Sequence, residues 1–376
     1  MKVNIPITKP YLGEDEKQLI SEVIDSGWIS QGPMVAEFEK KFAEYVGAKY
    51  AVATTSCTTA MHAALSVSGI GSGDEVIVPS LSFIATANAV VHCRATPVFV
   101  DIDAETCNMD AAKIEKAITQ KTKIIMPVHQ MGLPAEIDGI QKIAERHGLK
   151  IIEDAACAIG SAYRGKKIGG HGNATCFSFH PRKVITTGEG GMITTDDKDF
   201  AVRVKRFRHH GMSISDIERH ASDEVIIESY PEIGYNYRMT DIQAAMGIVQ
   251  LEKLQIILEK RREHAMRYDK ALRRIHCIRV PSVPSYIEHN YQSYWIEILD
   301  NAPVSRDVFM KKLLEKGIAT RRGIMAIHLE KCYSEYRVFL PETERITKNT
   351  VLLPIYPSMT GEEQNYVIQC INEVLP

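Results

Sequence analysis

Lys183 lies in a sequence context that favours nucleophilic chemistry. It follows the predicted strand TCFSFH and precedes the glycine-rich run Gly188-Glu189-Gly190-Gly191. A lysine amine in such a tight turn can lose its proton when it is desolvated or lies near other cations, and it can then form a Schiff base. Taken alone, however, the residue fits an ordinary solvated loop lysine better.

Two further stretches carry an acid pair and a candidate phosphate site. Glu153 and Asp154 end the apolar stretch LKIIEDA, where a partly desolvated carboxylate needs a cation, a metal or a protonated ring nitrogen as its partner. A helix N-cap explains an acid at that place equally well. TTSCTTA, at residues 54–60, begins a predicted helix whose free N–H groups and dipole suit a phosphate. An ordinary Ser/Thr cap is the simpler explanation of that stretch alone.

The elements around these stretches indicate one sheet. Apolar strands alternate with predicted helices from about residue 50 to 160, in the segments KYAVAT, DEVIVPS, ATPVFVDID, KTKIIMPVH and LKIIEDA. This pattern predicts βαβ units and a mainly parallel sheet covered on both faces. Because ligands collect at the carboxyl ends of such strands, the three stretches are expected to meet at one edge.

The rest of the chain predicts a second, smaller domain. Amphipathic helices are predicted over 14–26 and 34–47, around SGWISQGP, and one long helical pattern runs over 240–275. The last hundred residues mix strands and helices. We therefore expect a large α/β domain over 1–250 and a small C-terminal α+β domain over 251–376.

Composition excludes several classes of protein. The 376 residues carry 45 Lys plus Arg and 47 Asp plus Glu, a formal net charge of −2 that offers no basic excess for nucleic acid or membrane surfaces. No apolar run approaches the roughly 18 residues of a membrane helix, and MKVNIPITKP has no signal-peptide core. Eight scattered cysteines form no CxxC pair and no metal-ligand pattern, so we expect no metal and a cytoplasmic location.

Taken together, the three stretches fit pyridoxal 5′-phosphate. The lysine would form the Schiff base, and the helix start would bind the phosphate. The acid would keep the pyridine nitrogen protonated, so that the ring can accept electrons from a carbanion.

The whole sequence resembles a known family at this point. It is similar to the pyridoxal-phosphate-dependent aminotransferases that act on nucleotide-linked keto sugars, the DegT/DnrJ/EryC1/StrS family of fold type I. The resemblance covers nearly the whole chain, and its motifs occur in family order: SGWISQGP, TTSCTTAMHAAL, GDEVIVPSLSFIATANAV, PVFVDID, PVHQMGLPAEID, IIEDAACAIGS, FSFHPRKVITTGEGGM, GYNYRMTDIQAA and LPIYPSMT.

The resemblance implies roles for the cofactor site. Lys183 would be the Schiff-base lysine and proton shuttle, and Asp154 would pair with the pyridine nitrogen. Phe83 matches the aromatic residue that stacks on the cofactor ring, although it also fits a plain apolar helix residue. Cys57 and Thr58 match positions whose N–H groups bind the phosphate.

Three further positions complete that site. Ser178 matches a serine whose hydroxyl binds the phosphate. Asn236 matches an asparagine that reaches the phosphate from the other subunit, which implies a homodimer with shared active sites; a turn before the long helix explains it as well. Cys157 replaces the Gln or His that many members place near the ring oxygen, so that contact is expected to be weak. Cys57 stands where glycine is common.

Four residues are candidates for the sugar pocket. His328 and Arg321 lie where the family often contacts the nucleotide sugar, and Trp28 and Ser30 lie in the SGWISQGP turn. A histidine at the edge of the core, an exposed arginine and a Trp that only covers the core are equally good explanations.

The expected reaction moves an amino group from L-glutamate, which leaves as 2-oxoglutarate, to a keto sugar linked to a nucleoside diphosphate. The expected sugar is a 4-keto-6-deoxyhexose, and a 3-keto sugar is the second choice. The product would serve surface polysaccharide or O-antigen synthesis. A sugar dehydratase of the same fold is disfavoured because Lys183 is retained. A non-catalytic cofactor-binding regulator is disfavoured because the chain has no length for a DNA-binding domain, and a nicotinamide enzyme because no GxGxxG follows the first strand. The nucleotide, the carbon aminated, the stereochemistry and the pathway stay open.

Overall fold

The large part of the molecule is built on a seven-stranded sheet. The computed structural model describes residues 4–214 and 225–375. The strand order is β1-β9-β8-β5-β4-β2-β3. β9 runs antiparallel to β1 and β8, and the other neighbours pair in parallel. The strands are β1 (Tyr50–Thr54), β2 (Glu75–Pro79), β3 (Thr96–Val100), β4 (Thr122–Ile125), β5 (Lys150–Asp154), β8 (Ala174–Ser178) and β9 (Gly191–Thr195). The predicted α/β class with a mainly parallel sheet is confirmed.

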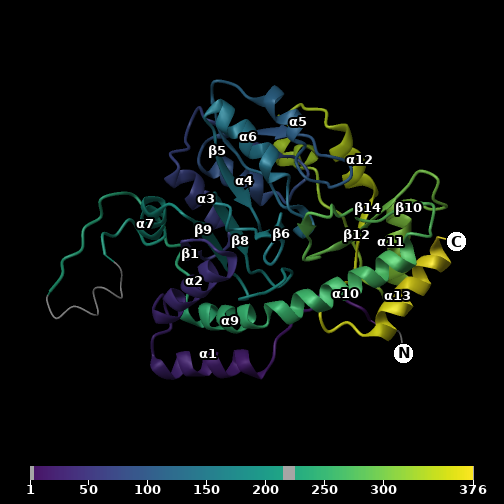
Figure 1. Cartoon of the computed structure of the whole chain (residues 1–376), viewed down its shortest axis with the longest axis horizontal. Coiled ribbons are helices and arrows are strands. Elements are labelled where there is room, and N and C mark those ends of the chain that lie inside the picture. The colour runs from purple at the N-terminus through teal and green to yellow at the C-terminus, as the bar shows by residue number, and fades with distance from the viewer. Residues whose placement is uncertain (1–3, 215–224, 376) are drawn as a thin grey trace.

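Helices cover both faces of this sheet, as Figure 1 shows. Neighbouring strand residues point to opposite faces, so Ile151 packs with one layer of helices and Ile152 with the other. This two-sided burial explains why the strands contain near-continuous apolar runs. One layer contains α3 (Cys57–Val67), α4 (Ala85–His92) and α7 (Lys198–Phe207), and the other contains α2 (Pro33–Val46), α5 (Ala111–Ile114), α6 (Ile137–His147) and α9 (Asp241–Glu252).

The long helical pattern predicted over 240–275 is two helices, and the prediction of one helix is wrong in this respect. α9 ends at Glu252 and α10 (Leu254–Leu272) begins two residues later. Lys253 lies between them, and its ammonium forms ion pairs of 2.8 Å with Glu16 and 2.9 Å with Asp15 of α1 (Glu14–Ser26). Together the two helices connect the two parts of the molecule, because α9 packs on α1 and α2 while α10 runs on to α13 (Figure 1).

The C-terminal part contains an antiparallel sheet of order β10-β12-β14-β13 with helices packed on it. The N-terminal segment joins it, because Ile5 pairs with Ile318 and is buried in the same core. The division into two domains near residue 250 stays a prediction. The elements are β10 (Ile278–Arg279), β12 (Tyr294–Ile298), β13 (Arg321–Arg322), β14 (Thr350–Leu353), α11 (Arg306–Glu315), α12 (Pro341–Asn349) and α13 (Gly361–Val374).

A third, short sheet connects the two parts. It has the order β11-β6-β7 and joins β11 (Ile287–Glu288) of the C-terminal part to the hairpin of β6 (Ala162–Tyr163) and β7 (Lys166–Lys167). Four single-turn helices complete the described elements, at Glu115–Ala117, Gln130–Gly132, Ile327–Leu329 and Lys331–Tyr333. Within residues 4–214 and 225–375, the helices are all too short or too polar to cross a membrane.

Candidate functional site

Lys183 lies in the connection between β8 and β9, at the carboxyl edge of the large sheet. Its backbone N–H donates to the carbonyl of His180 at 2.8 Å, which closes a tight turn. Its side chain runs back towards the sheet, where Nζ donates to Sγ of Cys157 at 3.1 Å. The amine is therefore directed into the protein and is not a solvated loop cation.

The surroundings of Lys183 favour its charged form. Burial alone would lower the pKa of the Lys183 amine, but Cys157, Cys57 and Asp154 outweigh burial and raise that pKa above its ordinary value. The sequence argument expected a lysine that loses its proton through desolvation. The structure instead surrounds the cofactor-free amine with groups that raise its pKa, so desolvation alone does not make it a base.

Asp154 is the last residue of β5 and is held by two hydrogen bonds. Oδ2 accepts from the hydroxyl of Thr86 at 2.8 Å, and Oδ1 accepts from the N–H of Ala156 at 3.1 Å. The side chain is buried, and its charge and that of Lys183 both act on the thiol of Cys57. These interactions confine the carboxylate to one place at the sheet edge, beside the lysine.

Glu153, its neighbour in sequence, points to the other face of the sheet and has different partners. Its carboxylate accepts from His129 Nε2 at 2.9 Å and from Asn173 at 2.8 Å. Burial alone would raise the pKa of Glu153, but these partners lower it overall. The predicted acid pair is thus one carboxylate at the site and one in a buried structural network.

The start of α3 forms a cradle of free N–H groups next to these residues. Ser56 and Thr59 cap each other, which leaves the N–H groups of Cys57 and Thr58 at the open end of the helix. A Cβ on Gly191 would come within 2.7 Å of the backbone nitrogen of Cys57, so β9 can approach the helix start only because this residue is glycine. Gly191 pairs with Ser178 in the β8–β9 register, which brings that hydroxyl to the same edge.

Phe83 presents an aromatic ring above this edge. Its side chain is 69% exposed, whereas Thr86, three residues later, is fully buried against Asp154. The ring therefore does not serve the core, which excludes the alternative of an apolar helix residue that only packs inside.

Two of the candidate sugar residues are hydrogen-bonded within the protein and two are exposed. His328 is buried, with Nδ1 at 2.6 Å from the Ser80 hydroxyl and Nε2 at 3.3 Å from Glu344. Trp28 donates from Nε1 to the carbonyl of Gln31 at 3.1 Å. These hydrogen bonds suit a structural role for His328 and Trp28, in which each side chain holds a neighbouring part of the protein in place. Ser30 and Arg321 are exposed.

Asn236 is exposed. It belongs to the described segment 225–240, which lies between α7 and α9 in the chain (Figure 1). Asn236 pairs with His209 in an isolated bridge. The next residue, Tyr237, accepts at its carbonyl from the N–H of Thr55 at 3.0 Å and approaches His62 Nδ1 with its hydroxyl at 3.1 Å. The segment that carries Asn236 is thus fixed beside the start of α3.

Sequence reasoning missed two residues that shape the site. Thr86 lies within the SFIATANAV motif. The available signal was a hydroxyl three residues after Phe83. Asn290 comes from the C-terminal part, and its side-chain amide donates to the carbonyls of Cys157 at 2.7 Å and Ile159 at 2.8 Å. Its contact with a turn 130 residues away in the chain gives no sequence signal.

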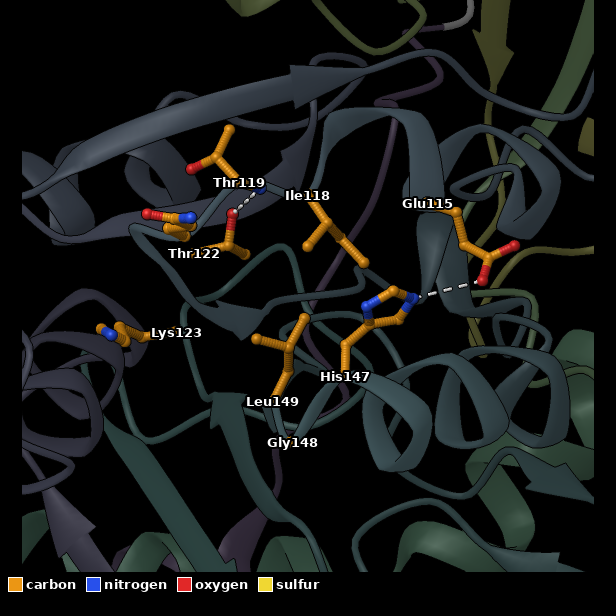
Figure 2. A pocket seen from close by; sticks show the side chains of 9 residues that line it. Glu115, Ile118, Thr119, Thr122, Lys123, His147, Gly148 and Leu149 are labelled. Atoms are coloured by element: carbon orange, nitrogen blue, oxygen red, sulfur yellow. Dashed lines mark hydrogen bonds and ion pairs between the residues drawn. The ribbon is translucent and has the colours of Figure 1, made fainter.

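Two pockets among the described residues lie away from Lys183. Figure 2 shows a pocket of about 590 Å³ between the start of β4 and the end of α6, lined by Glu115, Lys123 and His147 among others. A second, of about 250 Å³, opens at the start of β5 and β8. Both are at the amino edge of the sheet, opposite Lys183. The part of the chain described contains no group of three His, Cys, Asp or Glu residues arranged to hold a metal ion.

Comparison with known proteins identifies relatives over nearly the whole chain. The sequence model of the DegT/DnrJ/EryC1/StrS aminotransferase family matches residues 10–372. The GDP-perosamine synthase of Caulobacter vibrioides is 41% identical, with 99% of this chain and 98% of that protein covered. The spore coat polysaccharide biosynthesis protein SpsC of Bacillus subtilis is 38% identical, with 99% and 97% covered. A solved sugar aminotransferase of Streptococcus pneumoniae, in its PMP form, superposes with a TM-score of 0.94 at 29% identity over 99% of both chains.

Proposed function

The chain belongs to the DegT/DnrJ/EryC1/StrS aminotransferase family, and from this premise we propose that it moves an amino group from L-glutamate to a nucleoside-diphosphate-linked keto sugar through a Schiff base on Lys183. Pyridoxal 5′-phosphate is the cofactor. The observation that carries the proposal is the Lys183 amine, directed inward at the sheet edge next to the buried carboxylate of Asp154 and the open start of α3.

The residues at this edge fit the cofactor in charge and in hydrogen-bonding groups. The free N–H groups of Cys57 and Thr58, with the Ser178 hydroxyl, would hold the phosphate, and the close approach that Gly191 permits keeps that cradle open. The exposed ring of Phe83 would stack on the pyridine ring. Cys157, beside the lysine, would line the cofactor's ring oxygen only weakly, because a thiol is a poor donor.

The chemistry divides between two side chains. The bound cofactor supplies an electron sink for the carbanion that forms when the amino donor loses its α-proton. Asp154, fixed by Thr86, would hold a proton on the ring nitrogen, because its buried carboxylate needs a positive partner. Lys183 would be the base that takes the proton from the donor and returns it to the acceptor. Cofactor and substrate are held in place, so one amine can serve both half-reactions.

The acceptor we propose is a 4-keto-6-deoxyhexose attached to a nucleoside diphosphate, and the product would enter surface polysaccharide or O-antigen synthesis. The relative named GDP-perosamine synthase and the relative named for spore coat polysaccharide biosynthesis support this direction. Trp28, Ser30, His328 and Arg321 stay candidate sugar contacts. The hydrogen bonds of His328 and Trp28 favour a supporting position for those two.

We also propose a homodimer with shared sites, in which Asn236 reaches the partner's phosphate. Residues 225–235, which precede Asn236, include three exposed aliphatic residues: Val225 is 94% exposed, Ile227 88% and Ile233 88%. Apolar side chains so exposed and so close together are typical of a protein interface. A cytoplasmic location stays a prediction, in keeping with the eight unpaired thiols.

The first experiment is an absorbance spectrum of the purified holoenzyme before and after L-glutamate. Wild-type protein should show the band of lysine-bound cofactor at the edge of the visible range, and glutamate should move it into the near ultraviolet. Lys183→Ala should show neither the band nor the change. A bound cofactor that glutamate never alters would contradict the aminotransferase proposal. If glutamate does move the band, addition of keto sugars to the glutamate-treated enzyme would identify the acceptor.

Subunit mixing tests the shared site. Lys183→Ala and Asn236→Ala should each lose activity, and refolding them together should restore part of it. The mixed dimer then has one site with an intact lysine and an intact partner asparagine. If mixing restores nothing while the mixed dimer forms, Asn236 serves its own subunit and the shared-site proposal is wrong.

A further inference from the structure

Transamination does not require a thiol next to the Schiff-base lysine, yet this chain has one. Nζ of Lys183 and Sγ of Cys157 are 3.1 Å apart, close to contact between a nitrogen and a sulfur. The resemblance to the family leads one to expect Gln or His at position 157. The pair of an amine and a thiol in contact is therefore a property of this sequence.

Cys157 differs from the two other thiols at this edge. Cys57 and Cys176 are almost fully buried, and burial raises the pKa of both thiols well above the ordinary value. Cys157 is half-buried, so a small solute can reach it. Its sulfur also accepts a hydrogen bond from Lys183 Nζ at 3.1 Å, so the two reacting atoms are already in contact. Of these three thiols, Cys157 is the one that is both half-buried and hydrogen-bonded to the lysine.

The backbone around Cys157 is fixed. The Asn290 amide donates to its carbonyl at 2.7 Å, and the N–H of Ala156 donates to Asp154 at 3.1 Å. On the other side, the Lys183 N–H is bonded within its own turn. Neither partner can easily move away, so a reactive species formed on the sulfur stays in contact with the amine.

We propose that Cys157 and Lys183 form an oxidative modification site at which a hydroperoxide joins the two side chains by a sulfur–nitrogen bond. The Cys157 sulfur attacks hydrogen peroxide, forms a sulfur–oxygen bond as the O–O bond breaks, and becomes a sulfenic acid with release of water. Lys183 loses one proton to solvent, its neutral amine then attacks that sulfur, and the sulfur–oxygen bond breaks. The hydroxyl leaves with a proton from the amine as a second water. Sulfur is oxidised, peroxide is reduced, and the protein loses two hydrogen atoms.

This modification acts on the empty enzyme. A linked Lys183 has no free amine, so the cofactor cannot be bound covalently until a thiol reductant cleaves the sulfur–nitrogen bond and regenerates both side chains. In the resting holoenzyme, before an amino donor is added, the amine would be part of the Schiff base, and the linkage should not form. The site therefore couples loss of cofactor to sensitivity towards peroxide.

Intact mass and peptide mapping of the cofactor-free protein after hydrogen peroxide test the inference without using activity. We expect the loss of two hydrogen atoms, a cross-linked peptide pair containing Cys157 and Lys183, and reversal by a thiol reductant. Pyridoxal phosphate uptake, measured by absorbance, should fall in proportion to the linked fraction. The holoenzyme should stay unmodified at these positions.

Variants separate the linkage from its alternatives. Cys157→Ser should abolish it, whereas Cys332→Ser, which removes an exposed thiol far along the chain, should leave it intact. Lys183→Arg should stop at the sulfenic acid, which dimedone traps. A disulfide between Cys157 and Cys57 would give the same intact mass, so the link must persist in Cys57→Ser. A disulfide in the peptide map, or direct conversion of Cys157 to the sulfinic acid with Lys183 free, would overturn the proposal.

Discussion

The two edges of the large sheet differ in a way that decides where chemistry is possible. At the amino edge the pocket of Figure 2 has ample volume, but Glu115 forms solvent-exposed ion pairs with Arg146 at 2.9 Å and His147 at 3.3 Å. At the carboxyl edge, Asp154 is buried and Lys183 is directed inward. Volume alone does not identify a site, whereas a charged group held away from solvent does, because its desolvation must be compensated by a partner.

Strand direction explains the difference. The strands that pair in parallel all end at the carboxyl edge, and α3 begins there with free N–H groups, which attract a phosphate. At the amino edge α6 ends, and its last turn carries Arg146 and His147 next to free carbonyl groups. The two edges therefore have opposite electrostatic character.

The largest expected effect belongs to Lys183→Arg. This variant keeps a positive charge beside Cys157 but cannot form a Schiff base or take the donor's proton, so amino transfer should fall by ~10³-fold or more. Single-turnover rates with L-glutamate measure the loss. Binding of the cofactor's phosphate should survive, as seen by equilibrium dialysis. Residual turnover within tenfold of wild type would show that another group moves the proton.

Asp154→Asn comes next. The amide keeps the hydrogen bond from Thr86 but removes the charge that holds a proton on the ring nitrogen, so kcat should fall by ~10²-fold, the size of one charge-assisted hydrogen bond. The cofactor should remain bound, and its absorbance should titrate at a lower pH. If kcat and the titration are both unchanged, the carboxylate does not face the ring nitrogen.

Glu153→Gln provides the matched contrast one residue away, with an effect on stability and none on the cofactor's spectrum. Because the folded pKa of Glu153 is lowered from 4.5, its contribution is present above the unfolded pKa and is lost as the pH falls through the folded value. The wild type should therefore lose stability with acid below about pH 4.5, and the variant less steeply. At neutral pH the variant should cost about 1–3 kcal/mol, measured as the free energy of unfolding in urea. A steeper acid limb in the variant would contradict the assignment.

The contrast between Glu153 and Asp154 also shows what the sequence can reveal. The alternation of strands and helices predicts the sheet, and its carboxyl edge follows from that. The motifs place Lys183, Asp154 and Cys57 at that edge. The pattern cannot tell which acid of a neighbouring pair faces the site, because that depends on His129 and Thr86, which lie on other elements. Nor can it reveal Asn290, or that the helical pattern over 240–275 is interrupted at Lys253, whose ammonium pairs with α1.

Thr86→Val should have a smaller effect of the same kind as Asp154→Asn. Valine keeps the branched shape but removes the donor to Asp154 Oδ2, at a cost of about 1 kcal/mol, equivalent to a several-fold lower kcat/KM. Steady-state kinetics with saturating cofactor measure it. Combined with Asp154→Asn, the second substitution should add little, since both act through one carboxylate. Full additivity would mean that Thr86 acts independently of Asp154.

The smallest effect is expected at the amino edge. Variants there test directly whether the two edges of the sheet act independently. Glu115→Gln removes the acid that pairs with Arg146 and His147, but all three side chains are exposed, so the free energy of unfolding should change by no more than about 0.5 kcal/mol. Cofactor binding and the glutamate-dependent spectral change should equal those of wild type. His147→Gln should behave in the same way, because it removes the other partner of one solvated pair. If either variant alters cofactor affinity, the pocket at the amino edge is coupled to the site across the sheet, and the separation of the two edges does not hold.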